Sequence, residues 1–87
     1  MTKTEARQFI GQPVQMLWRD PQGFAGWTTT PLGLESALNQ TVCWVVGLNA
    51  RGELVTAATL GSAEWSDLNA MPLACVVSMA RIKLPKA

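Results

Sequence analysis

Residues 41–60 read TVCWVVGLNARGELVTAATL, and this stretch decides the fold that the sequence predicts. Its first half has apolar side chains at every second position, which is the spacing of one face of a β-strand. These residues are Val42, Trp44, Val46 and Leu48. The polar, glycine-containing segment 49–52 then breaks the run before a second β-rich stretch, 53–60. The pattern predicts a β-hairpin, and the flanking segments favour its extension into a small β-barrel.

The segment before this hairpin predicts a short helix and a first strand. Thr2 or Thr4 can cap a helix over residues 5–10, and Gly11 can end it. Val14, Met16 and Trp18 then alternate with their neighbours, as in a strand with one face inward. We therefore expect Trp18 and Trp44 to face inward from neighbouring strands and to form the middle of the core. A turn is predicted at residues 20–23, whose sequence is DPQG.

The region between the first strand and the hairpin carries Trp27 in a loop of small residues. Two interpretations stay open: Trp27 caps one open end of the barrel, as large aromatic residues tend to be buried, or it stacks on a ligand. Thr30 and Pro31 are typical of a helix start, and Leu34 and Leu38 would share one helical face. We expect a connector helix of at most two turns.

Two segments follow the hairpin. Residues 61–70 read as a polar loop whose Trp65 either folds over the barrel rim with Leu68 or serves as a recognition anchor. Residues 71–84 read as two short strands joined by a bend near Ser78, with Pro72 at a strand start. A helix over this segment is the alternative, since apolar residues also recur there at every third position.

Composition indicates a chain that associates with itself. The 87 residues fit one domain, 1–87, yet only 15% are charged while 48% are apolar. So few charges leave apolar or neutral surface that we expect to meet another chain. The net charge of +1 gives no long-range field that would attract polyanions.

The sequence lacks the usual signs of an enzyme. It contains no histidine, no glycine-rich phosphate loop and no CxxC motif, and among its acids only Glu64 and Asp67 lie close together, as solvated loop charges. We therefore predict no catalysis, no cofactor and no metal. Cys43 and Cys75 each lie in an apolar run and are predicted to be buried and reduced. Without a secretion signal or a membrane-spanning run, the sequence predicts a cytoplasmic protein that does not enter a membrane.

Several short motifs together resemble a group of small uncharacterised proteins from phages, prophages and environmental sequences. They are Trp18-x-Asp20, Gly26-Trp27, the hairpin 42–60 and Met71-Pro72-x-x-Cys75-Val76-x-x-Met79. The resemblance implies a five-stranded SH3-like or Sm-like barrel that often forms rings or other symmetric assemblies. Two positions depart from the group: Cys43 replaces a glycine, and Leu73-Ala74 replaces Lys-Gly. The second change removes a positive charge at a loop where Sm-like proteins would meet RNA.

Two functions from different classes follow. The favoured prediction is a phage-related interaction or assembly module that forms homo-oligomers. This prediction is also compatible with binding to a further protein partner. The alternative is an Sm-like protein that binds RNA or single-stranded nucleic acid, with a basic tail supplying phosphate contacts and loop aromatics stacking on bases. The tail comprises Arg81, Lys83 and Lys86, although lysines on an edge strand also serve to discourage pairing. The candidate interaction residues are Trp27, Arg51, Trp65, Arg81 and Lys83.

Overall fold

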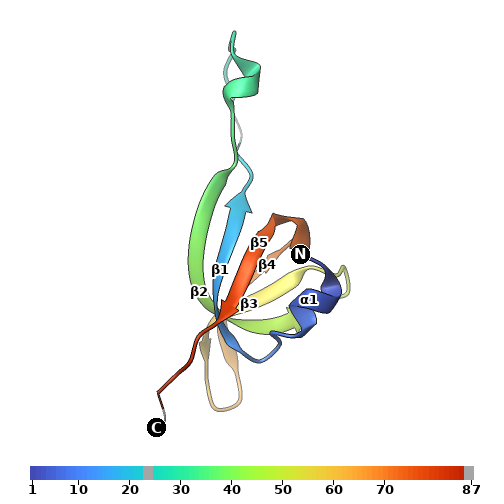
Figure 1. Cartoon of the computed structure of the whole chain (residues 1–87), viewed down its shortest axis with the longest axis vertical. Helices are drawn as coiled ribbons and strands as arrows, with labels where there is room; N and C mark the ends of the chain where they lie inside the picture. The colour runs from blue at the N-terminus through green and yellow to red at the C-terminus, as the bar shows by residue number, and fades with distance from the viewer. Residues whose placement is uncertain (23–24, 86–87) are drawn as a thin grey trace.

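The chain forms one antiparallel sheet with a short helix at its N-terminus (Figure 1). The structure is a computed structural model, and it describes residues 1–22 and 25–85. Its elements are α1 (Lys3–Arg7), β1 (Pro13–Asp20), the 3-10 turn η1 (Pro31–Gly33), β2 (Ala37–Leu48), β3 (Leu54–Leu60), β4 (Trp65–Met71), the 3-10 turn η2 (Leu73–Cys75) and β5 (Val76–Arg81).

The five strands lie in the order β4-β3-β2-β1-β5, and each neighbouring pair is antiparallel. The predicted β-rich fold, its five strands and its short N-terminal helix are thus confirmed. β4 and β5 are the two ends of this order and do not pair with each other. The described sheet is therefore open, and closure into a barrel is not seen.

Helix α1 begins at a reciprocal cap formed by Thr2 and Glu5. The Thr2 hydroxyl accepts a hydrogen bond from the Glu5 N–H at 3.1 Å, and Glu5 Oε1 accepts one from the Thr2 N–H at 3.0 Å. This arrangement satisfies two amides that have no partner within the helix. The helix begins earlier than the predicted 5–10 and ends at Arg7. Gly11 follows the helix with φ of 79°, and its N–H donates to the Val45 carbonyl oxygen.

The core lies on one face of the sheet, beneath α1. Its buried members are Ala6, Val14, Met16, Cys43, Val45, Leu54, Met71 and Val76. The prediction that Val14 and Met16 face inward is confirmed, since they are 0% and 1% exposed. Burial on folding removes such side chains from water and supplies most of the stability of a domain this small.

The predicted inward face of β2 is wrong. Cys43 and Val45 point into the core, whereas Val42 is 69% exposed. The cause is the register with β1, which pairs Val14 with Cys43. Residues directly opposite each other in an antiparallel pair share a face, so buried Val14 places Cys43 inward. A register shift between Val45 and Gly47 then lets Leu48 pack against the core.

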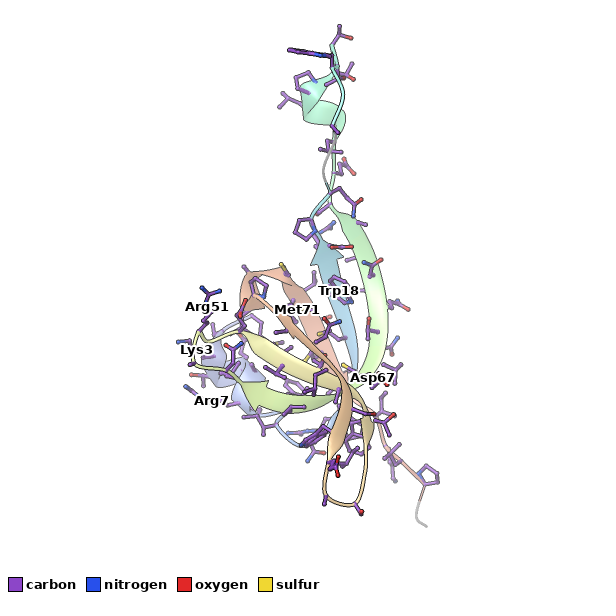
Figure 2. All side chains as sticks on the ribbon, turned by 180° about the vertical axis from the view of Figure 1, so that it is seen from behind. Lys3, Arg7, Trp18, Arg51, Asp67 and Met71 are labelled. Atoms are coloured by element: carbon purple, nitrogen blue, oxygen red, sulfur yellow. The ribbon has the colours of Figure 1, made fainter. Side chains whose placement is uncertain are left out.

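The two tryptophans expected in the middle of the core lie elsewhere. Trp18 is partly buried at the margin of the core, and its Nε1 donates to the Thr41 hydroxyl at 2.8 Å (Figure 2). Trp44 is on the opposite face of the sheet because it neighbours inward Cys43 and Val45. The prediction that both tryptophans form the middle of the core is therefore wrong.

A projecting arm replaces the predicted connector helix. β1 and β2 remain paired as far as Asp20 and Ala37, and the arm, residues 25–36, extends beyond the sheet (Figure 1). Within residues 25–36, only Pro31–Gly33 forms a helical turn, and Leu38 already belongs to β2. A helix this short needs a surface on which to dock, and the arm finds none in the described chain. The turn predicted at 20–23 includes Gly23, which lies outside the described residues.

The C-terminal third also differs from expectation. Trp65–Met71 is strand β4 instead of a loop, because it pairs in register with β3 from Leu60 opposite Trp65 to Leu54 opposite Met71. The main bend lies at η2 instead of near Ser78, and β5 continues through Ser78 with a register shift against β1 just before it. The strand alternative for this segment is thus correct, but it contains one strand after the bend, not two.

Candidate interaction surfaces

Trp27 lies on the arm and is 102% exposed. Leu32 on the same arm is 97% exposed. The interpretation of Trp27 as a cap on the end of a barrel is therefore wrong. The side chain lies away from the core because the arm continues the direction of β1 and β2 past the last paired residues (Figure 1).

Trp65 lies at the start of β4 and is half-buried. Its ring meets that of Trp44 edge to face, with ring centroids 6.5 Å apart. Ala57, on the strand between them, is opposite Trp44 in the register and is 1% exposed. These contacts give Trp65 a structural role on the outer side of the sheet. Leu68, predicted to fold over a rim, is 62% exposed.

Arg81 is held by the N-terminal segment. Its guanidinium donates to the Gln8 carbonyl oxygen at 2.7 Å and lies 5.4 Å from the centre of the Phe9 ring. It thus fastens the turn after α1 to the end of β5. Lys83 is exposed just after β5. Lys86, the third residue of the predicted basic tail, lies outside the described residues.

Arg51 lies in the turn between β2 and β3. The Asn49 side-chain oxygen accepts from the backbone N–H of Arg51 and of Glu53, each at 3.0 Å, which orders this turn. Figure 2 shows the Arg51 side chain at the same end of the molecule as Lys3 and Arg7 of α1. Lys3 and Arg7 also line a hollow of about 290 Å³ with residues of the turn.

Sequence reasoning missed this basic group, which we call the Arg51 end: Lys3, Arg7 and Arg51. Helix and turn are far apart in the chain, and only the packing of α1 over the sheet brings them together. One of the predicted loop aromatics, Trp27, lies apart from Arg81 and Lys83. Trp27 is on the arm, whereas the C-terminal segment leaves the opposite end of the molecule (Figure 1).

The sheet has two free edges, β4 and β5. Asp67 is the one charged residue of β4, and Arg81 is the one charged residue of β5. β3 is not an edge strand, because it pairs with both β2 and β4. On β4 the extended conformation is interrupted at Asp67, whose φ is 56°. β5 has an irregularity of its own, because its register with β1 shifts between Leu17 and Trp18 and leaves Val77 without an opposite residue.

The two cysteines differ in exposure. Cys43 is buried, as predicted, whereas Cys75 is only partly buried, so that half of the prediction is wrong. Burial raises the pKa of the Cys43 thiol, and a hydrogen bond with Thr56 acts in the opposite direction. Over residues 1–22 and 25–85, no group of three or more potential metal-binding side chains occurs. Within the same residues no helix has the length and apolar character needed to cross a membrane.

Comparisons with protein-family models, curated proteins and solved structures each found no match to this chain. The resemblance to small phage proteins remains a prediction from the motifs alone. The geometry of the described residues is thus the main basis for a functional proposal.

Proposed function

We propose that this protein is a non-enzymatic module that self-associates through the free edges of its sheet. The observation that carries the proposal is the open order β4-β3-β2-β1-β5, which leaves one side of β4 and one side of β5 without a strand partner in the described chain. Roughly half of the backbone amides and carbonyls of an edge strand point away from its neighbour. Such groups form a template for pairing with another chain.

The composition of the edges supports pairing. Edge strands of monomeric proteins are commonly protected by lysine, proline or inward charges. β5 contains none of these before its last residue, Arg81, and β4 contains only Asp67. Val77 on β5 and Leu68 on β4 are 52% and 62% exposed, so each edge also offers apolar surface. Association would remove both from water.

Two arrangements satisfy these edges. Pairing of β5 with β5 gives a two-fold dimer, whereas pairing of β4 with β5 of the next copy must close into a ring to avoid polymerisation. The motif resemblance to phage and prophage proteins supports a phage-related assembly role. With so few charges involved, the association should depend little on salt.

Light scattering at micromolar concentration tests the proposal. We expect a mass that is a multiple of the 9.4 kDa chain. Val77→Lys places a charge on the β5 edge and should reduce the mass, whereas Ile10→Lys, a matched change at a 45% exposed residue that belongs to neither edge strand, should not. A wild-type protein that stays monomeric would contradict the proposal.

A second candidate is binding of RNA or single-stranded DNA, which the Arg51 end favours. Three cations from α1 and the β2–β3 turn lie at one end of the molecule (Figure 2). A labelled oligonucleotide whose binding weakens with salt, and weakens further in Arg51→Gln and Lys3→Gln, would support it. Lys83→Gln is the control for the basic tail, and it should leave the binding of the oligonucleotide unchanged if the Arg51 end makes the contact. Nucleic-acid binding is the second candidate because the net charge of +1 gives no long-range field that would attract a polyanion.

A further inference from the structure

We propose that the arm, residues 25–36, docks on the sheet of a second copy of this chain, with Trp27 as the anchor. This inference rests on the proposed self-association and assigns it a contact separate from the strand edges. The receiving surface is the side of β5, β1 and β2 that faces away from the core, called the outer face below.

The arm carries apolar side chains that its own chain leaves in solvent. Trp27 and Leu32 are 102% and 97% exposed, and Leu34 is 51% exposed. No arm residue is among those packed against the core of the described chain. Glu35 is the one charged residue of the arm. Tryptophan on a projecting element with a single charge is the type of residue that concentrates binding energy at an interface.

The outer face is suited to such an anchor. Its position follows from the register, in which Leu17 of β1 is opposite Gln40 of β2 and Ser78 of β5. These residues alternate with the inward Met16 and Met79. A hollow of about 350 Å³ lies here, lined by Gln15, Met16, Leu17, Gln40, Ser78, Met79 and Ala80. None of these side chains is charged, so an indole can enter without stripping water from an ion.

The reach of the arm fits a reciprocal exchange. Trp27 is seven residues past the end of β1, which is at most about 23 Å at ~3.3 Å per residue. The Leu17–Gln40 pair lies three residues inside the base of the arm at Asp20 and Ala37, or about 10 Å by the same rise. Two copies related by a two-fold axis near the arm bases can therefore each place Trp27 over the other's hollow.

A second copy fits these surfaces better than nucleic acid does. The arm contains no lysine or arginine that could neutralise phosphate. Both the arm and the hollow are nearly uncharged, so each matches the other in polarity. An aromatic side chain buries about 150–250 Å². Two arms with their leucines, together with the faces that they cover, would bury a total surface area that approaches the ~1,200 Å² at which stable interfaces begin.

Site-directed cross-linking tests the contact. A Thr29→Cys chain is mixed with a Ser78→Cys chain, both carrying Cys75→Ser so that the remaining native thiol is the buried Cys43. A short bis-maleimide should join the two chains. A Thr29→Cys chain mixed with Ser62→Cys is the matched control, because Ser62 lies in the exposed turn between β3 and β4 and should give no product.

Trp27→Ala provides the second measurement. The side chain is fully exposed in the single chain, so the variant should keep its circular dichroism spectrum while its association weakens roughly tenfold or more. An oligomer unchanged by Trp27→Ala, with no Thr29–Ser78 product, would overturn the arm contact and leave edge association standing. A wild-type monomer would overturn both proposals.

Discussion

The rings of Trp44 and Trp65 meet edge to face, with an interplanar angle of 64°. Their strands, β2 and β4, are not neighbours in the sheet, because β3 lies between them. Ala57 of β3 is opposite Trp44 and is buried. A methyl side chain at this position leaves room for the two rings to meet, and their contact links three strands on the side of the sheet away from the core.

We predict that Trp44 and Trp65 are energetically coupled. A double-mutant cycle with Trp44→Ala and Trp65→Ala should give a coupling free energy of about 0.5–1.5 kcal/mol in denaturant unfolding. Trp44→Ala alone should cost less than the ~3–5 kcal/mol of a fully buried tryptophan, since this side chain is half-buried. Trp27→Ala is the control, and additive effects of the two changes would contradict the prediction.

Leu54 should be among the most sensitive core positions. It is 0% exposed and packs with the buried residues beneath α1, so Leu54→Ala should lower the free energy of unfolding by about 2–5 kcal/mol. Leu68→Ala provides the same change at a side chain that is 62% exposed, and should alter stability by no more than about 0.5 kcal/mol. Equal effects at the two sites would mean that the described core is wrong.

Thr2 should stabilise the N-terminal helix through its cap. Thr2→Ala should cost about 0.5–2 kcal/mol in thermal or denaturant unfolding. Thr4→Ala, the same change inside the helix, should have little effect because the Thr4 side chain is exposed. A larger loss of stability in Thr4→Ala than in Thr2→Ala would contradict the assignment of the cap to Thr2.

The cap should also depend on pH. Hydrogen bonds from the backbone and side chain of Thr2 hold the pKa of Glu5 below its ordinary value. The folded state therefore favours the ionised carboxylate. This contribution is present above the ordinary glutamate pKa and is lost as the pH falls through the lowered one. The stability difference between wild type and Glu5→Gln should shrink on acidification, as unfolding at a series of pH values would show.

Cys43 should react slowly and Cys75 faster. Because burial raises the pKa of the Cys43 thiol, its reactive thiolate is scarce at neutral pH. Stability from this group is present below the thiol pKa of the unfolded chain and is lost as the pH rises through the raised folded value. Mass-resolved maleimide labelling of wild type and Cys75→Ser measures both rates. Rapid labelling of Cys43 in the folded protein would contradict its burial.

Local sequence signals located most of the elements correctly. The capping residues around Thr2, the alternation at Val14 and Met16, and the polar break at 49–52 each depend on neighbours in the chain, so their physics is visible without a fold. Strand β4 is not apparent in the sequence because Ser66, Asp67 and Asn69 break up its apolar residues, which do not alternate regularly. An edge strand needs only one apolar face and a backbone partner, which β3 supplies.

The sequence by itself determined that this chain is β-rich, poor in charge and built on a central hairpin, since composition and period-two patterning are local properties. Only the tertiary structure decided which side of β2 faces inward. Val42, Cys43, Trp44 and Val45 are all apolar, so either face could be buried, and the pairing of Val14 with Cys43 selects one. Tertiary packing likewise leaves Trp27 in solvent, unites Lys3 with Arg51, and makes β4 and β5 the free edges.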